Sequence, residues 1–293
     1  MFTACDKDNL KETEQEIAIN GGQSLKSYSS INRVKTFYLP DYDENSWCSL
    51  QPLAGDIFPV NCIAGTSYKG LIICGGVNGR KLRYMSDYNE DIWISIPDAP
   101  FIVSDIAGEN SGGPIIVGGI DSKEIAYLTN YEDGTWEYVK GDIPWEVKGV
   151  AGVNSKGIAI FGGDNNREVA YINDYYHPKW TKTQVAPFPI KGIAGENEYG
   201  VVIFGGDGDK INRVAYLTSN SNWCEVRKAP VCINKIAGDN KYGPVILGGT
   251  SGLEVWYMRS YSSQEWIKLR NIPQMKTVDI CGTNKRGPIV VGY

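Results

Sequence analysis

The side chains that most often do chemistry in proteins are few in this sequence and poorly spaced for it. The one histidine, His177, lies in the segment DYYHPKW. Imidazole is the usual general base and the commonest metal ligand, so histidine-based triads, multi-histidine metal sites and most copper chemistry lack parts. The turn GGDGDKIN holds Asp207 and Asp209 but lacks the remaining acids of a recognised calcium loop. The sequence therefore predicts no metal and no cofactor.

The seven cysteines do not have the spacing of a metal cage. They contain no CxxC pair, and most lie inside apolar runs such as LIICGG, where a free thiol behaves as a small buried hydrophobe. Two pairs, Cys48 with Cys62 and Cys224 with Cys232, fall in corresponding stretches of two repeat units. If the protein is exported, a disulfide within such a pair is an open alternative. The cysteines as a group indicate structure rather than catalysis.

Two sets of polar side chains recur at a fixed spacing and are the candidate binding residues. One set is four bases, each four residues after a Gly-Gly pair: Arg80, Lys123, Arg167 and Lys210. The other set lies one or two residues before an Ile-Ala-Gly motif or a close variant: Asp105, Lys148, Lys191, Asn234, Lys235 and Asp279. The bases could dock an acidic partner, or could pair with neighbouring acids and only solvate the turn. The second set could bind a small anionic or sugar ligand, or line a water-filled hole through charge pairs.

Both sets recur because the chain is built from a repeat. The Ile-Ala-Gly motif or a variant ends at glycines 43 or 44 residues apart, namely Gly65, Gly108, Gly152, Gly195, Gly238 and Gly282. Another glycine follows ten residues after each, and the first five of these begin a Gly-Gly pair. Seventeen residues beyond each pair stands a tryptophan, at Trp93, Trp136, Trp180, Trp223 and Trp266, and a sixth, Trp47, has no such pair before it. A fixed period of this kind decides the architecture.

Each unit contains four short candidate strands and no useful helical periodicity. In the second full unit the strands are expected over 101–107, 114–117, 124–128 and 135–139, separated by turn-rich sequences. The runs PIIV, IAIF, VVIF and PVIL do not alternate with polar residues, which indicates strands buried on both faces. Four strands in a period near 43 residues are typical of a propeller. The sequence predicts an all-β, six-bladed β-propeller with four-stranded antiparallel blades.

The two ends of the repeat are incomplete and complement each other. The first tryptophan lacks the first half of its unit, and the last Ile-Ala-Gly variant lacks the second half. Strands within 276–292 would supply the inner half of one blade, and 33–39 with 46–50 its outer half. N- and C-terminal strands would then share one blade and close the ring. We expect the propeller over residues 31–293 and a tail outside the repeat over residues 1–30.

The order apolar run, Gly-Gly, Tyr, Trp, then Pro seven residues later resembles the kelch repeat in five copies over about residues 60–275. The unit is somewhat short, and the arginine common just after the proline is missing. The stretch YLTNYEDGTW is also similar to the aspartate-box turn of sialidase-type propellers. Tyrosines occupy the place of the box aspartate, at Tyr88, Tyr131, Tyr175 and Tyr261. Both resemblances imply a propeller, a fold that carries enzymes, lectins and protein-docking platforms alike.

Charge and hydropathy bear on partners and location. With 29 basic and 34 acidic residues, the net charge of −5 lacks the broad positive field that nucleic-acid binding uses. No apolar run approaches the roughly 18 residues of a membrane helix. The first 15 residues are polar and acid-rich rather than a secretory leader. We expect a cytoplasmic protein with no nucleic-acid or membrane partner, while export without such a leader stays open.

The expected function is non-catalytic binding of another protein, acidic at its docking surface, by a monomer that uses loops at one mouth of the ring. A lectin with sites between blades is one alternative. A sugar mutarotase of the six-bladed kelch kind, with one axial site, is another, since it needs only an acid/base side chain and a positioning arginine. Sialidase-type hydrolysis is disfavoured, because the arginines do not recur at one blade position suited to a substrate carboxylate.

Overall fold

The structure is a computed structural model. It describes residues 34–40, 42–43, 46–51, 53, 59–67, 70–85, 92–109, 113–131, 134–154, 157–172, 177, 179–197, 200–218, 222–238, 243–284 and 287–293. These residues belong to one compact unit, Arg33–Tyr293. The tail expected over residues 1–30 lies outside the described residues.

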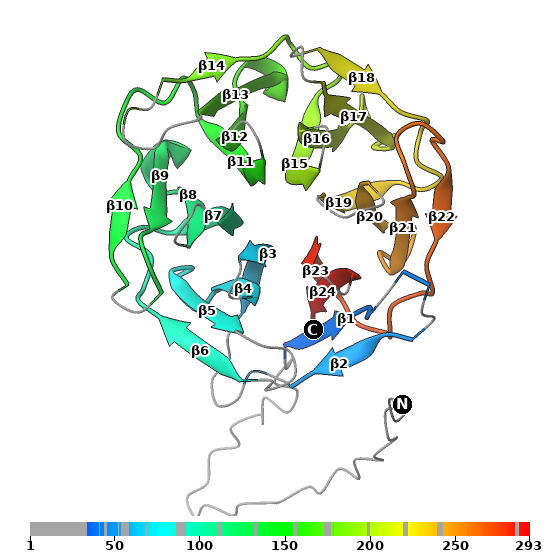
Figure 1. The fold of residues 1–293 in the computed structure, drawn as a ribbon, viewed down its shortest axis with the longest axis horizontal. Helices are drawn as coiled ribbons and strands as arrows, with labels where there is room; N and C mark the ends of the chain where they lie inside the picture. The colour runs from blue at the N-terminus through cyan, green and yellow to red at the C-terminus, as the bar shows by residue number, and fades with distance from the viewer. Residues whose placement is uncertain are drawn as a thin grey trace, which may run out of the picture. The chain divides into compact units, whose positions relative to one another are not determined.

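The compact unit is a ring of six four-stranded antiparallel sheets, blades 1 to 6 (Figure 1). Blade 1 contains β3 (Val60–Ser67), β4 (Gly70–Gly75), β5 (Lys81–Met85) and β6 (Trp93–Ile96), and blade 2 contains β7 (Val103–Glu109), β8 (Pro114–Gly118), β9 (Glu124–Leu128) and β10 (Trp136–Tyr138). Blade 3 contains β11 (Val147–Asn154), β12 (Gly157–Gly162), β13 (Glu168–Ile172) and β14 (Thr181–Lys182), and blade 4 contains β15 (Ile190–Asn197), β16 (Gly200–Gly205), β17 (Arg213–Leu217) and β18 (Trp223–Glu225). Blade 5 contains β19 (Ile233–Ala237), β20 (Val245–Gly248), β21 (Glu254–Met258) and β22 (Trp266–Lys268), and blade 6 contains β23 (Thr277–Asn284), β24 (Gly287–Gly292), β1 (Lys35–Tyr38) and β2 (Cys48–Leu50). The first strand named in each blade is the innermost, which confirms the predicted six-bladed propeller.

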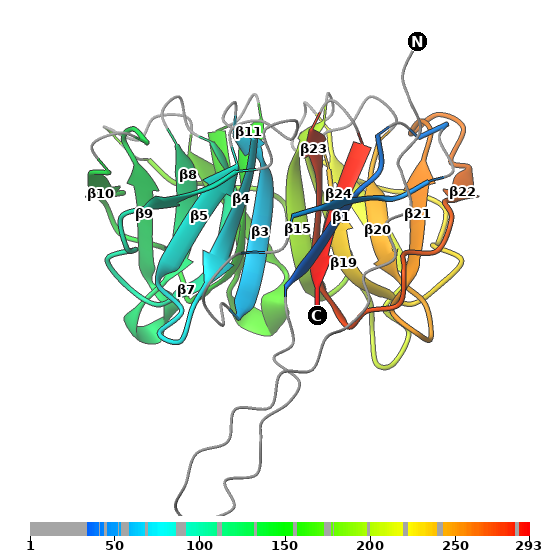
Figure 2. The ribbon, with the colours of Figure 1, turned by 90° about the horizontal axis from the view of Figure 1, so that it is seen from below.

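Blade 6 is assembled from the two ends of the repeat. Its strand order is β2-β1-β24-β23, so the N-terminal β1 lies beside the C-terminal β24 (Figure 2). The antiparallel register runs from Lys35 opposite Gly292 to Tyr38 opposite Ile289. Thr36 lies in the middle of this sheet, opposite Val291 on one side and Leu50 on the other, and is 2% exposed. The sharing of one blade between distant segments therefore follows the prediction.

The core lies between blades, because both faces of each sheet are covered by neighbouring sheets. Every residue of β8, β16 and β24 is buried, as expected for apolar runs without polar alternation. Ile72 of β4 and Ile116 of β8, from adjacent blades, belong to one buried cluster. Two short 3-10 turns, Ile120–Ser122 and Asp164–Asn166, follow the Gly-Gly pairs of blades 2 and 3.

The two positions of each Gly-Gly pair require glycine for different structural reasons. A Cβ atom on Gly75 would lie 1.9 Å from the carbonyl oxygen of Pro59, so the first position needs a residue without a side chain. Gly76 has a φ of +80°, a left-handed conformation that glycine adopts at little cost. The pair therefore lets the second strand end against the backbone that leads into the first strand and turn sharply.

The repeated tryptophans fasten blades to their neighbours. Indole Nε1 atoms donate to backbone carbonyl oxygens of the preceding blade or its connection: Trp93 to Gln51 (3.2 Å), Trp136 to Pro97 (3.3 Å), Trp223 to Gln184 (2.8 Å), Trp266 to Arg227 (2.9 Å) and Trp47 to Arg270 (2.9 Å). The last bond joins blade 6 to blade 5 across 223 residues of sequence. These tryptophans thus have a structural role in the contacts between blades.

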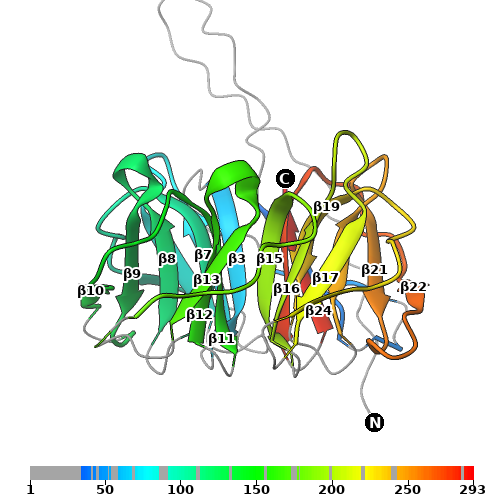
Figure 3. The ribbon, with the colours of Figure 1, turned by 90° about the horizontal axis from the view of Figure 1, so that it is seen from above.

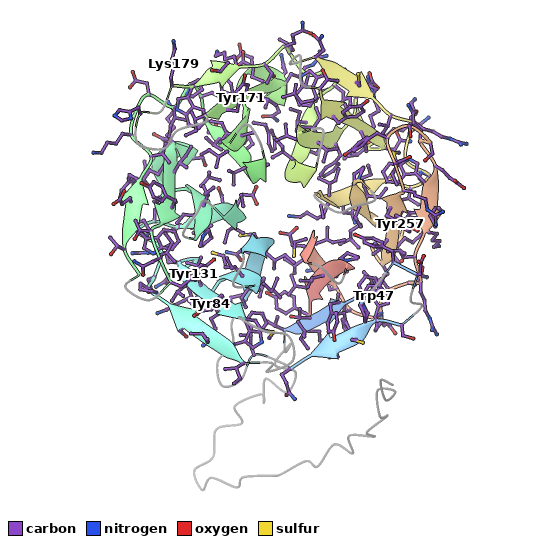
Figure 4. All side chains as sticks on the ribbon, viewed as in Figure 1. Trp47, Tyr84, Tyr131, Tyr171, Lys179 and Tyr257 are labelled. Atoms are coloured by element: carbon purple, nitrogen blue, oxygen red, sulfur yellow. The ribbon has the colours of Figure 1, made fainter. Side chains whose placement is uncertain are left out.

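Tyrosine pairs reinforce the same contacts between blades. The rings of Tyr84 and Tyr131, both labelled in Figure 4, belong to neighbouring blades, and their centroids are 4.8 Å apart. The centroids of Tyr42 and Tyr257 are also 4.8 Å apart. Tilted pairs at this separation are favourable beyond the area that they bury. Tyr131 occupies the place where an aspartate-box turn would hold its aspartate, and here it is a buried packing residue.

The tryptophan contacts predict different effects for two equivalent substitutions. Trp223→Phe removes an indole that donates a hydrogen bond at 2.8 Å, whereas the buried Nε1 of Trp180 has no hydrogen-bond partner among the described residues. We expect Trp223→Phe to lower the free energy of unfolding by about 1 kcal/mol more than Trp180→Phe does. Urea unfolding of both variants measures the difference. Equal losses would contradict a contribution from the hydrogen bond.

Candidate functional site at the axis of the ring

Most described loops lie on one face of the ring, which we call the mouth face. It carries the turns between the second and third strands of the blades, such as 76–80 and 119–123, and the connections between blades, such as 97–102 and 183–189. Figure 3 shows this face at the top, with the C-terminus. Each innermost strand begins at this face and runs away from it.

A register irregularity near the start of every innermost strand places the axial side chains. In blade 2 it falls between Val103 and Asp105, and in blade 5 between Ile233 and Lys235. A β-bulge re-aims side chains at such a point. This explains why residues one and two positions before the Ile-Ala-Gly motif reach the same place. One cavity of about 170 Å³ is lined by all six predicted axial residues, Asp105, Lys148, Lys191, Asn234, Lys235 and Asp279.

Two of these residues clamp neighbouring blades together. Asp279 of blade 6 accepts a hydrogen bond from the backbone N–H of Ile63 in blade 1, with Oδ2 at 3.1 Å, and Asp105 of blade 2 accepts one from Val150 in blade 3, with Oδ2 at 2.9 Å. The Oδ1 atom of each aspartate accepts from the N–H of the next residue at 3.0 Å. Each carboxylate therefore satisfies two backbone donors at the axis.

Lys235 makes the electrostatics of the two aspartates unequal. Its Nζ atom lies 3.4 Å from Oδ1 of Asp279, whose negative charge raises the pKa of the lysine. Burial raises the pKa of Asp105 to about 6, although the charge of Lys235 opposes the increase. Asp105 therefore binds a proton much more readily than an ordinary carboxylate, and it titrates within the physiological range.

The remaining side chains of the predicted axial set lie on three neighbouring blades. Lys148 forms an ion pair with Glu146. Lys191 and Asn234 are exposed, and neither side chain has a hydrogen bond or ion pair with another described residue. The cavity thus contains donors that the described part of the protein does not use.

Phenylalanines, which sequence reasoning missed, explain the shape of the cavity. Gly149 and Gly192 stand where Asp105 stands in blade 2, and each lies opposite a phenylalanine, Phe161 or Phe204, across the strand pair. A Cβ atom on these glycines would be 2.5 or 2.3 Å from Cε1 of the facing ring. The two rings therefore line the cavity without side chains between them. A signal for this is present in the sequence. The two units with phenylalanine before Gly-Gly, IAIFGG and VVIFGG, are also the two with glycine directly before the Ile-Ala-Gly motif or its variant.

Beyond the polar cavity the axis narrows. A space of about 70 Å³ is lined by the Ile-Ala-Gly motifs or their variants from all six innermost strands. Adjacent strands approach closely there, since a Cβ atom on Gly238 would lie 2.4 Å from the carbonyl oxygen of Gly195. The polar cavity is thus followed by a narrow neck of aliphatic side chains and backbone.

The four predicted bases are not part of the axial cavity, and two of them have structural partners. Nε of Arg80 donates to the carbonyl oxygen of Ala99 at 2.6 Å, and Nε of Arg167 donates to that of Ala186 at 2.9 Å. Lys123 and Lys210 are exposed in the corresponding turns of blades 2 and 4. The bases lie on one face as expected, but each belongs to a different blade, and docking through them stays a prediction.

An exposed aliphatic patch on the mouth face was not predicted. Val77 is 89% exposed, Ile120 82% and Ile102 63%, and they lie in the mouth-face loops of blades 1 and 2 and in the connection between them. Ile102 lies between the two loops, because its carbonyl oxygen accepts a hydrogen bond from Gly119 N–H at 3.0 Å, and the N–H of the next residue, Val103, donates to the carbonyl oxygen of Gly79 at 2.9 Å. Val77 and Ile120 directly follow Gly-Gly pairs, where blades 3 and 4 have Asp164 and Asp207. We call these three residues the aliphatic patch.

Other residues considered from the sequence lie away from both features. His177 is exposed between β13 and β14. Asp207 forms an ion pair with Arg213 at 3.4 Å. The six cysteines that the structure describes form no disulfide, so neither Cys48–Cys62 nor Cys224–Cys232 is bridged. Among the described residues, no helix has the length and hydropathy to span a membrane.

The sequence matches no family model, and a search of curated proteins finds no match. Several solved structures are similar in fold. Virginiamycin B lyase from Staphylococcus aureus has a TM-score of 0.53 and 13% identity, over 85% of each chain. The chain has a β-propeller fold. The propeller is also similar to YCF48 bound to D1 peptide (TM-score 0.52, 12% identity, 90% of this chain and 89% of that one) and to U3-55K (TM-score 0.53, 11% identity, 82% and 97%). At these identities the likeness concerns the fold alone, and nothing in it is specific to kelch repeats.

Proposed function

We propose that the protein is a non-catalytic binding module that captures a segment of another protein on its mouth face. The observation that carries this proposal is the aliphatic patch of Val77, Ile102 and Ile120. Single exposed hydrophobic residues are normal, but three such side chains in joined loops are a candidate contact surface. Burying one side chain of this kind contributes about 1.5–3 kcal/mol. Their branched Cβ atoms also limit the rotamer freedom that binding would remove.

Charges beside the patch indicate the chemistry of the partner. Lys81 forms an ion pair with Asp98 at 3.0 Å, and Glu124 accepts a hydrogen bond from Ile120 N–H. Lys123 is exposed and has no ion pair with another described residue, and Asp121 is the exposed acid of the same turn. The partner that fits best is an extended segment with two aliphatic side chains and a nearby acidic residue. YCF48 bound to D1 peptide, a protein of similar fold that holds a peptide, is a precedent for this use of a propeller.

Selection from a random peptide library tests the proposal. We expect wild-type protein to enrich peptides that contain aliphatic residues next to Asp or Glu. The combined variant Val77→Ser, Ile102→Ser and Ile120→Ser should bind them about 10-fold or more weakly, which corresponds to roughly 1.4 kcal/mol. Lys123→Glu should weaken only the peptides that carry the acid.

Ile92→Ser is the matched control, since Ile92 is 56% exposed but directly precedes the outermost strand β6. It should bind the selected peptides like wild type. Equal binding by the combined variant would overturn the proposal. Binding of a glycan at several sites per chain would instead favour the lectin, and turnover of a sugar would favour the mutarotase-like enzyme.

A further inference from the structure

Three neighbouring innermost strands present hydrogen-bond donors at one repeat position. Lys148 of β11, Lys191 of β15 and Asn234 of β19 each stand two residues before the Ile-Ala-Gly motif or its variant, at the bulge, and all line the axial cavity. Only Lys148 has a charged partner among the described residues, and this partner, Glu146, does not line the cavity. Two ammonium groups and one amide on consecutive blades form an arc suited to the oxygens of an anion.

The charge balance of the lining also favours an anion. Its ionisable side chains are Lys148, Lys191 and Lys235 against Asp105 and Asp279, which gives a formal charge of +1 in a chain of net charge −5. Asp279 is compensated by Lys235 and by two backbone N–H groups. Asp105 also accepts two backbone N–H groups, so neither carboxylate needs a cationic ligand.

The shape of the cavity limits the ligand to one small molecule. The rings of Phe161 and Phe204 occupy the space over Gly149 and Gly192, where a Cβ atom would collide with them, and both rings line the volume of about 170 Å³. The space beyond it, lined by the Ile-Ala-Gly motifs or their variants, is smaller, at about 70 Å³.

We propose that the axial cavity binds one small oxyanion, a carboxylate or a phosphate, through Lys191, Lys148 and Asn234. This site is separate from the aliphatic patch and does not depend on peptide binding. The arc of donors occurs on three of the six blades, so the expected stoichiometry is one anion per chain.

Asp105 makes the affinity depend on pH. The charged groups that share the cavity with it are Asp279, Lys235, Lys148 and Lys191, and the Cys62 thiol lies nearby. Below a pH of about 6 Asp105 is mostly protonated, so it no longer repels an anion and gains an O–H donor. Binding should therefore tighten as the pH falls from 7.5 to 5.5, a window chosen around the pKa of Asp105.

Calorimetric titration of the full chain with acetate, methyl phosphate and sulfate tests the site. We expect one sulfate to bind per chain, and acetate, methyl phosphate or both to bind with the same stoichiometry. Whichever of acetate and methyl phosphate binds more tightly identifies the natural ligand as a carboxylate or a phosphate. Lys191→Met should weaken binding about 10-fold or more, since it removes a charged hydrogen bond and keeps the aliphatic stem. Lys140→Met, at an exposed lysine outside the cavity, is the matched control and should bind like wild type.

Sulfate keeps its charge between pH 5.5 and 7.5 and therefore reports the protonation of the protein. Its affinity should rise at the lower pH in wild type and stay nearly constant in Asp105→Asn, provided that thermal unfolding shows this variant to be folded. No binding of any of the three anions at millimolar concentration would overturn the proposal. Unchanged affinity in Lys191→Met, or tighter binding of methylammonium than of the anions, would also overturn it.

Discussion

Thr36→Pro should lower the free energy of unfolding by about 3 kcal/mol or more. Thr36 is in the middle of blade 6, paired on one side with Leu50 and on the other with Val291. Proline lacks the N–H that a central strand needs and cannot be accommodated there without loss of ladder hydrogen bonds. The loss falls on the only pairing that joins the first described strand to the last.

Thermal and urea unfolding measure this effect, and the midpoint temperature should fall by about 6–12 °C for a chain of this size. Thr36→Val is the control, because it keeps the backbone donor and a similar shape while it removes the hydroxyl. We expect it to cost no more than about 1.5 kcal/mol, the net contribution of one hydrogen bond of the lost hydroxyl. If Thr36→Pro unfolded like wild type, the β1–β24 pairing would not be what closes the ring.

Asp279→Ala should be the second most damaging change, with a loss of about 2–4 kcal/mol. It removes the acceptor for the N–H groups of Ile63 and Ile280 and leaves Lys235 without its ion-pair partner. We place the estimate below the full cost of breaking a buried ion pair because the Lys235 side chain is 41% exposed and can regain water.

Asp105→Ala is the internal comparison for this prediction, since Asp105 clamps the next blade in the same way without a lysine within ion-pair distance. We expect about 1–3 kcal/mol for it, measured by urea unfolding at pH 7.5. Lys235→Met in the Asp279→Ala background should restore part of the stability. Identical losses for the two aspartates, with no recovery in the double variant, would show that the ion pair adds nothing.

The fold was predictable because each repeated residue type has one structural requirement. Gly75 must avoid the carbonyl of Pro59, and this glycine recurs in every complete unit. Trp223 reaches the carbonyl of Gln184, and four other repeated tryptophans bond a backbone carbonyl in the same way. The axial residues could be located for the same reason, since equal positions in a repeat become rotationally equivalent around the axis. Trp47 was assigned to a shared blade on spacing alone, and it donates to Arg270 as expected of that blade.

The parts that could not be predicted depend on contacts between units or on side-chain direction. The spacing of Arg80 says nothing of its hydrogen bond to Ala99, which removes one donor from the expected basic docking set. Phe161 packs over Gly149 and lines the cavity, and a search for polar residues passes over such a ring. The aliphatic patch was missed because Val77 in a turn carries no chemical signal until its exposure is known.

The shared blade has a consequence for how the protein is made. During translation β1 and β2 leave the ribosome early, yet the partner of β1 is β24, whose residues 287–292 are synthesised more than 200 residues later. Until then the nascent chain exposes a strand edge of the kind that pairs with other chains. Bringing such distant segments together also carries a loop-closure entropy that local hairpins avoid, so it should be a late step in folding. Blades 1 to 5 can form before β23 and β24 are synthesised, whereas blade 6 can be completed only after them.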